Sequence, residues 1–245
     1  MNMNNEWLTR TELLLGGKDL KKLSDANVLV VGLGGVGAYA AELICRAGVG
    51  RMTVIDGDNI ETSNRNRQLL ALKSTEAQSK AMLMSDRLKD INPNAEITAI
   101  HEFIRDDRMK EILSFHYDYV VDAIDSLSPK VYLIKISLDN GLRVVSSMGA
   151  GGKMDPSKAR VSDIDDSYKC KLARTVRKRL HRLGITTGFK VVFSPEDVPD
   201  EAVLAIEGDE AKNKNSIVGT ISYMPAIFGI YCASTVINDL IEKGG

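Results

Sequence analysis

VLVVGLGGVG, residues 28–37, joins a compact apolar run to a glycine-rich turn. Residues 28–31 predict a buried strand, and the small side chains of residues 36–47 (VGAYAAELICRA) predict a helix packed closely on a sheet. A G-x-G-x-x-G turn between a strand and a helix lets phosphate oxygens approach the N–H groups at the helix N-terminus. The glycines are Gly32, Gly34, Gly35 and Gly37. This stretch therefore predicts an α/β fold with a nucleotide site.

Short β-branched runs and longer helical stretches alternate through the residues that follow. The expected strands are residues 52–56, 97–100, 119–122 and 144–146. The expected helices are residues 75–91, with Thr75 as N-cap, residues 105–114 and residues 130–140. Parallel strands need crossover connections, and right-handed crossovers place helices on both faces of the sheet. We expect a Rossmann-like doubly wound sheet, with residues 1–148 as the nucleotide-binding half of a single domain spanning residues 1–245.

The second half, residues 149–245, is expected to be a substrate-binding elaboration, because the regular alternation fades there. Residues 155–166 are acidic and turn-rich, residues 172–183 form a basic amphipathic pattern, and residues 195–215 are polar. Residues 216–238 carry no charge and are about as long as a membrane span of roughly 20 residues. Pro225 and two glycines interrupt them, which favours a buried strand, a turn and a packed helix; a spanning helix is the alternative.

Charge and cysteine content narrow the classes of function. Lys and Arg total 32 against 33 Asp and Glu, so the net charge of -1 argues against a general nucleic-acid coat protein or a polybasic membrane binder. Cys45, Cys170 and Cys232 are too scattered for a disulfide framework, and no CxxC pair predicts a zinc site. The first ten residues lack an apolar stretch of signal-peptide length. The expected location is the cytoplasm.

An acidic residue ends the second expected strand at the spacing of a ribose ligand. Asp56 lies 19 residues after Gly37, where a carboxylate can accept hydrogen bonds from a ribose diol. Redox dehydrogenases and adenylating enzymes share these features, so the nucleotide itself is left open by the motif.

The residues after Asp56 carry a more specific resemblance. Residues 56–68 read DGDNIETSNRNRQ, which is similar to the D-x-D-x-(V/I)-x-x-S-N-x-x-R-Q run of the E1-like ThiF/MoeB/HesA adenylating superfamily. Lys80 lies 13 residues after Arg67, and residues 122–126 (DAIDS) resemble the D-x-x-D-(N/S) motif of that superfamily. The three motifs occur in the order found in that superfamily.

The resemblance implies an ATP site and assigns its residues. Arg67 and Lys80 would hold the phosphates, Asp56 the ribose, and Asp125 magnesium or the reacting phosphate. The full set implied to contact ATP is Gly32, Gly34, Gly35, Gly37, Asp56, Asp58, Asn64, Arg67, Gln68, Lys80 and Asp125. Attack of a carboxylate on the α-phosphorus builds negative charge that Arg, Lys and Mg²⁺ stabilise. The alternative for Arg67 and Lys80 is solvated surface charge.

The N-terminal segment adds one more implied catalytic residue. Arg10, in RTELLLG, resembles the arginine that this superfamily lends to the ATP site of the neighbouring subunit. The resemblance therefore implies a homodimer in which Arg10 acts in trans.

A later segment distinguishes branches of the superfamily. Residues 146–156 (SSMGAGGKMDP) resemble the G-A-G-G-x-x-D-P segment of the tRNA threonylcarbamoyladenosine dehydratase branch, and the likeness runs from Arg10 to about Leu240. It implies ATP-dependent ring closure of N6-threonylcarbamoyladenosine at position 37 of tRNA to cyclic t6A, with release of AMP and pyrophosphate. The alternative is adenylation of the C-terminal Gly-Gly of a ubiquitin-like sulfur carrier, whose activators usually carry paired CxxC motifs. A redox protein that binds NAD is a more distant alternative.

One dense basic block, residues 169–182, suits an RNA partner. Apolar residues recur at helical spacing, so the cations face outward and can meet tRNA phosphates. The expected tRNA contacts are Lys171, Arg174, Arg177, Lys178 and Arg182. The alternative is an ordinary solvated face.

Cys170 has two interpretations, a thiol nucleophile or no catalytic role, and the second is favoured because ring closure within one substrate needs no thiol. The sequence identifies no protein partner of the sulfurtransferase or cysteine desulfurase type.

Overall fold

A seven-stranded, mostly parallel sheet organises the chain, of which the computed structural model describes residues 3–205 and 216–242. The strand order is β3-β2-β1-β4-β5-β7-β6, and only the edge strand β6 runs antiparallel to its neighbour. The strands are β1 (Asn27–Val31), β2 (Arg51–Ile55), β3 (Glu96–Ile100), β4 (Tyr119–Asp122), β5 (Arg143–Ser147), β6 (Arg160–Asp163) and β7 (Lys190–Phe193). The expected doubly wound α/β sheet is confirmed.

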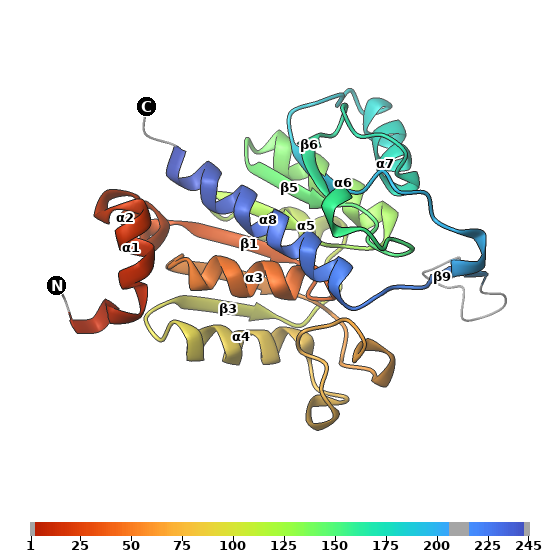
Figure 1. Cartoon of the computed structure of the whole chain (residues 1–245). Helices are drawn as coiled ribbons and strands as arrows, with labels where there is room; N and C mark the ends of the chain where they lie inside the picture. The colour runs from red at the N-terminus through yellow and green to blue at the C-terminus, as the bar shows by residue number, and fades with distance from the viewer. Residues whose placement is uncertain (1–2, 206–215, 243–245) are drawn as a thin grey trace.

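Helices cover both faces of this sheet (Figure 1). One face carries α3 (Gly37–Arg46), α4 (Lys80–Ile91) and α8 (Tyr223–Glu242), and the other carries α5 (Asp106–Leu113), α6 (Leu127–Asp139) and α7 (Lys171–His181). Side chains of a strand alternate between faces. In β1, Val28 and Val30 join the first core, whereas Leu29 and Val31 join the second. The apolar run in the sequence follows from this burial on both sides.

The N-terminal elements lie at the amino end of β1, on the left of Figure 1. They are η1 (Met3–Leu8), α1 (Thr9–Leu15) and α2 (Gly17–Asp25). The sequence analysis did not anticipate α2, which buries Leu20 and Leu23. The Lys22 ammonium donates a hydrogen bond to the carbonyl of Ile241, which ties α2 to the C-terminal end of α8.

The expected start of the helix over residues 75–91 is wrong. Thr75 instead ends the short 3-10 turn η3 (Lys73–Thr75), and α4 begins at Lys80. Ala77 has φ 65°, a left-handed conformation that a right-handed helix cannot contain. The cap is Ser79, whose side chain accepts a hydrogen bond from the Met82 N–H at 3.4 Å.

The second half holds more strand than its composition suggests. Residues 155–166 contain β6 as well as the expected turns, and residues 195–215 contain η5 (Asp200–Ala202) and β8 (Val203–Ala205). β8 pairs with β9 (Ser216–Val218) in a separate two-stranded sheet. The remainder of the expected polar stretch, residues 206–215, lies outside the described residues.

The uncharged segment over residues 216–238 forms β9, a turn and most of α8, as expected. By length and composition alone, α8 could cross a membrane, because its mean hydropathy is 1.4. Half of this apolar segment, however, is buried inside the protein. Phe228, Cys232 and Val236 are fully buried, and α8 packs on α3. The core helix of a globular domain has the same properties, so α8 is weak support for a membrane span.

Candidate functional site

The carboxyl ends of the parallel strands bring the expected site residues to one edge of the sheet. The glycine turn follows β1, Asp56 follows β2, Asp125 follows β4, and Gly149 follows β5. The strand order reverses between β1 and β4, and α/β proteins bind ligands in the crevice at such a switch point.

Close packing explains three glycines of the turn, and the fourth has only an ordinary contact with a side chain. Gly32 has φ +89°, and a Cβ there would lie 2.7 Å from the carbonyl oxygen of Ala123. A Cβ on Gly37 would lie 1.8 Å from a backbone oxygen, and one on Gly35 would lie 2.8 Å from a proline of α8. A Cβ on Gly34 would approach nothing closer than 3.8 Å. Packing within the described chain therefore does not require glycine at position 34, which is consistent with a ligand that lies against this backbone.

Asp56 is tied to the glycine turn. Its Oδ2 accepts a hydrogen bond from the Leu33 N–H at 2.6 Å, and its Oδ1 accepts one from the Asp58 N–H at 2.8 Å. Burial raises the pKa of Asp56 above its ordinary value, while the charge of Lys80 and the two amide bonds oppose that rise. A carboxylate has about four acceptor positions, so acceptors remain for a ribose diol.

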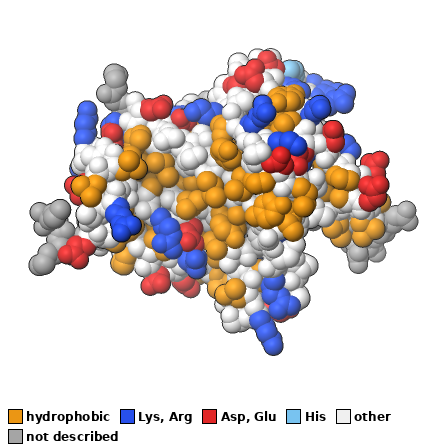
Figure 2. All heavy atoms as spheres, viewed as in Figure 1, with side chains coloured by type: hydrophobic (Ala, Val, Ile, Leu, Met, Phe, Trp, Pro, Cys, Tyr) orange, Lys and Arg blue, Asp and Glu red, His pale blue; other side chains and the backbone are white. Residues whose placement is uncertain are grey.

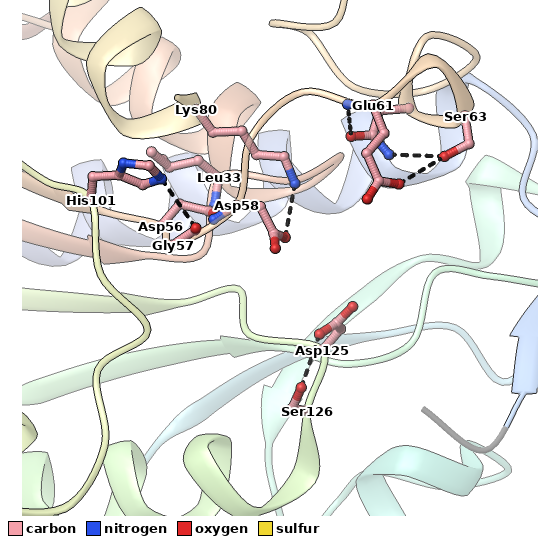
Figure 3. Close-up of polar contacts among 11 residues, drawn as sticks. Leu33, Asp56, Gly57, Asp58, Glu61, Ser63, Lys80, His101, Asp125 and Ser126 are labelled. Carbon is pink, nitrogen blue, oxygen red and sulfur yellow. Dashed lines mark hydrogen bonds and ion pairs between the residues drawn. The ribbon is translucent and has the colours of Figure 1, made fainter. Parts of the chain in front are cut away.

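Lys80 is a buried cation at the first residue of α4. Its side chain is 6% exposed, and its Nζ lies 3.0 Å from Oδ2 of the exposed Asp58. The N-terminal end of a helix disfavours a cation, so this position needs a nearby anion. In Figure 3 the carboxylate of Asp125 points toward the Asp58–Lys80 pair from the opposite side, and Ser126 Oγ donates to it at 3.3 Å. Lys80 and Asp125 thus point toward the same region at the carboxyl edge of the sheet.

Asn64 supports the loop that carries the arginine. It ends the 3-10 turn η2 (Thr62–Asn64) and is buried, and its Oδ1 accepts a hydrogen bond from the Glu61 N–H at 3.1 Å. Its carbonyl accepts the N–H groups of Arg67 and Gln68 at 3.1 and 2.9 Å. The Asn64 side chain is therefore occupied by the loop, and its part in a nucleotide site is to place the next residues.

Arg67 and Gln68 differ in how they are held. Arg67 Nη1 donates to the carbonyl of Ser63 at 3.0 Å and to Asn66 Oδ1 at 2.8 Å. The buried Oε1 of Gln68 has no hydrogen-bond partner among the residues that the structure describes. Buried polar atoms are normally paired, so this atom marks a position where a bound group is expected. Its Nε2 lies near Gly34.

A fully buried ion pair, which the sequence analysis did not assign to the site, fixes the turn before Asp125. Asp122 Oδ2 accepts hydrogen bonds from Lys130 Nζ at 2.7 Å and Ser146 Oγ at 2.6 Å, and its Oδ1 accepts from the Ile124 N–H at 3.1 Å. Both charged side chains are 0% exposed. The feature of the sequence that could have revealed this pair is Lys130, because it lies on the buried face of its helix.

Glu196 anchors the segment after β5 and was also missed. Its Oε1 accepts the N–H groups of Met154 and Asp155, both at 3.0 Å. The buried Lys153 donates to the Glu196 carbonyl, and burial lowers the pKa of that lysine. Residues 149–155 are therefore held in place by Glu196, which lies in the stretch that the sequence showed only to be polar, residues 195–215.

The basic helix α7 separates into an outward row and one internal arginine. The exposed row is spaced i, i+3, i+7, i+11 and consists of Lys171, Arg174, Lys178 and Arg182. Arg177 differs, because its Nη1 donates to Ile164 O at 3.2 Å, Ser167 O at 2.6 Å and Ser167 Oγ at 2.7 Å. Its guanidinium is committed to the fold, so we leave Arg177 out of the proposed RNA contacts.

Two further expected residues lie away from the region between Lys80 and Asp125. Arg10 is exposed on α1, at the amino end of β1 and so at the opposite end of that strand from the glycine turn.

Cys170 is buried at the N-cap of α7. Burial raises the pKa of Cys45 to about 11 and that of Cys232 to about 12, which keeps those thiols protonated near neutral pH.

The donor set fits a metal only as part of a nucleotide complex. Within residues 3–205 and 216–242 no three His, Cys, Asp or Glu side chains cluster to hold an ion. Mg²⁺ usually binds through one or two carboxylates together with substrate phosphates and water. A single carboxylate, Asp125, fits that pattern.

The sheet, the glycine turn and the charged groups around the switch point define a nucleotide-binding protein of the E1-like fold. A model of the ThiF family matches residues 8–244, so the chain belongs to the ThiF family. It is 36% identical to tRNA threonylcarbamoyladenosine dehydratase of Bacillus subtilis, over 96% of this chain and 94% of that protein.

Structural comparison gives the same family. The crystal structure of Escherichia coli tRNA N6-threonylcarbamoyladenosine dehydratase in complex with ATP matches with a TM-score of 0.89 and 32% identity, over 99% of this chain and 97% of that one. The Escherichia coli sulfur carrier protein ThiS adenylyltransferase is 30% identical, but over only 55% of this chain. The likeness to the dehydratases therefore includes the second half of the chain.

Proposed function

We propose that the chain is a cytoplasmic enzyme that uses ATP to dehydrate N6-threonylcarbamoyladenosine at position 37 of tRNA to its cyclic form. The observation that carries the proposal is the likeness to dehydratases over nearly the whole chain, including residues 149–245. The orientation of Lys80 and Asp125 toward one region near the switch point supports it.

The residues present fit an ATP molecule at this edge. Packing within the described chain does not require the glycine at position 34, and Asp56 retains acceptors for the ribose. Lys80 and Arg67 supply positive charge for the phosphates, and Asp125 would hold a magnesium ion carried on them. Lys80, now paired with Asp58, would exchange that carboxylate for phosphate. The remaining members of the proposed ATP site are Gly32, Gly35, Gly37, Asn64 and Gln68.

The reaction follows from the charge of the site. The threonyl carboxylate of the substrate attacks the α-phosphorus of ATP, and pyrophosphate leaves. A nitrogen of the carbamoyl group of the same side chain then attacks the activated carbonyl, loses a proton and displaces AMP, so one carboxylate oxygen leaves on AMP. Lys80 and Arg67 stabilise the charge that builds on the phosphate oxygens. Because both reacting groups belong to one side chain, ring closure needs no enzyme nucleophile.

A turnover assay tests this function. Purified protein with ATP, Mg²⁺ and tRNA carrying the threonylcarbamoyl group should release AMP, and the nucleoside should lose the mass of one water. Unmodified tRNA is the matched control. Release of no AMP from the modified tRNA would contradict the proposal.

The sulfur-carrier alternative makes a different prediction. Its activators would exchange pyrophosphate only when a carrier protein with a C-terminal Gly-Gly is present, whether or not tRNA is added. The partial coverage of the ThiS adenylyltransferase speaks against this alternative.

We further propose that two copies of the chain complete the site, with Arg10 of one copy serving the other. Arg10 lies at the wrong end of the sheet for its own nucleotide. Leu13 and Leu14 on the same helix are each 82% exposed, and Ile230 of α8 is 44% exposed. Figure 2 shows an apolar band across the middle of the face that α8 crosses. A second copy would cover it.

Mixing two inactive variants tests the exchange of Arg10. Arg10→Ala and Arg67→Ala should each lose turnover as pure dimers. After subunit exchange, half of a two-fold symmetric population is mixed and each mixed dimer has one complete site, so about a quarter of the wild-type activity should return. No recovery after verified exchange would contradict action in trans.

A further inference from the structure

A basic hollow with an aromatic wall lies outside the nucleotide site. It has a volume of about 530 Å³ and opens where β7 ends and β6 begins. Its walls include three cations, Lys158, Arg160 and Lys169, together with the ring of Tyr168. None of these residues belongs to the proposed ATP site or to the outward row of α7.

The ring of Tyr168 packs against Phe193, carries the guanidinium of Arg160 over it and is partly exposed. Tyr168 is 44% exposed, and its ring packs edge-to-face on the buried ring of Phe193, with centroids 5.6 Å apart and an interplanar angle of 75°. The guanidinium carbon of Arg160 lies 5.8 Å from the centroid of the Tyr168 ring. Unpaired bases stack on such aromatic and guanidinium planes.

The charges of the hollow favour an anionic ligand. Two carboxylates, Glu196 and Asp197, also line it, so the three cations exceed the lining carboxylates by one charge. Lys158 Nζ lies 3.4 Å from Oδ2 of Asp155, which leaves Arg160 and Lys169 as the cations without an ion pair to that residue. Lys169 has φ 54°, a left-handed conformation that costs free energy in a lysine and that tends to occur at functional positions. It directly precedes the N-cap of α7, so the exposed cations of that helix continue from the hollow.

The hollow shares an edge of the sheet with the nucleotide site. β7 is parallel to β5, so both strands end at the edge where Asp125 and the glycine turn lie. Two steps between neighbouring strands, from β4 to β7, span roughly 10 Å. A nucleic-acid strand with a rise of about 3.4 Å per residue covers that distance in a few nucleotides.

We propose that this hollow binds an unpaired nucleotide of the tRNA anticodon loop, close to the adenosine whose side chain is activated. Its base stacks on Tyr168 and Arg160, and its phosphate lies against Lys158 and Lys169. This inference rests on the proposed function, because a single-stranded loop around position 37 is the part of the substrate that must reach this edge.

Binding of a fluorescently labelled anticodon stem-loop that carries the threonylcarbamoyl group tests the inference in the full chain. Tyr168→Ala should weaken binding by roughly five- to a hundredfold, and Tyr168→Phe should bind as the wild type does. Arg160→Gln should weaken binding, and Lys169→Gln should also reduce the slope of log affinity against log salt concentration by roughly 0.7. Lys89→Gln, at an exposed position of α4, is the matched control and should change neither quantity.

ATP affinity, measured on the same samples, reports whether each variant is folded and should be unchanged. If Tyr168→Ala also loses ATP affinity, Tyr168→Leu keeps bulk against Phe193 without an aromatic face and should show the same loss of RNA affinity. If Arg160→Gln and the folded Tyr168 variant both bind the stem-loop as tightly as the wild type, and the wild type still releases AMP, the inference about the hollow is wrong. The proposed function is not affected by that result. A wild type that neither binds the stem-loop nor releases AMP would overturn the proposed function as well.

Discussion

The two ends of the carboxyl edge are built on different physical principles. Around β1, β2 and β4 the charged groups are buried or held by partners in the chain, as Lys80 is by Asp58 and Asp122 by Lys130. Beyond β5, along α7 and the basic hollow, most cations are exposed and point to solvent. The first arrangement keeps charges in fixed positions before a ligand arrives, which suits chemistry. The second adapts to a large flexible anion, which suits docking.

Removal of Lys80 should have the largest effect on turnover, and the comparison would fail if turnover did not change. Lys80→Ala should reduce AMP release by roughly 10²–10³-fold, because one fixed positive charge is lost where phosphate charge builds. Lys89→Ala, on the exposed side of the same helix, should retain turnover. Steady-state kinetics measures both, and an unchanged unfolding midpoint shows that Lys80→Ala is folded. A Lys80→Ala enzyme with near wild-type turnover would remove Lys80 from the catalytic set.

Separation of the buried pair should lower stability rather than substrate affinity. Lys130→Met leaves the Asp122 carboxylate buried without its cation, which should cost about 3–5 kcal/mol of the free energy of unfolding. Urea denaturation measures this change. The double variant Asp122→Leu, Lys130→Met should recover much of the loss, because no uncompensated charge remains. If the single variant is as stable as the wild type, the pair does not fix the turn before Asp125.

The smallest expected effects separate two arginines three residues apart on α7. Arg174→Gln should weaken tRNA binding several-fold and reduce the salt slope by about one, with little change in stability. Arg177→Gln should instead lower the free energy of unfolding by about 1–3 kcal/mol, because three acceptors lose a charged donor. Equal effects of the two substitutions on the salt slope would contradict the separation of α7 into a docking row and a structural arginine.

Local pattern was sufficient for most of the sheet and for the edge at which the proposed nucleotide site lies. Strands buried on both faces are short and apolar, so residues 28–31 and 119–122 stand out in the sequence. The motifs from Asp56 to Asp125 lie next to strand ends, and parallel pairing alone brings them to one edge. The start of α4 was missed because the left-handed backbone at Ala77 leaves no trace in hydrophobic periodicity.

Contacts between distant parts of the chain account for what the sequence did not reveal. Glu196 meets Met154 and Asp155 across about forty residues, and no spacing rule links them. The edge strand β6 reads RVSD, which lacks the apolar run of a central strand. Arg177 shares composition and periodicity with Arg174, so only the three-dimensional contacts assign them different parts.

Side-chain hydrogen bonds hold the helix α8 at both of its ends. These bonds restrict the length of the helix more than they restrict its amino-acid composition. Near its start, Tyr223 Oη donates to the Met154 carbonyl at 2.8 Å, beside the segment that Glu196 holds. Near its end, Asp239 accepts hydrogen bonds from Tyr119 Oη at 2.7 Å and Lys190 Nζ at 2.6 Å. One inserted residue would turn one end against the other by about 100° and release one fastening. Among relatives of this chain, we expect insertions or deletions within α8 to be rare.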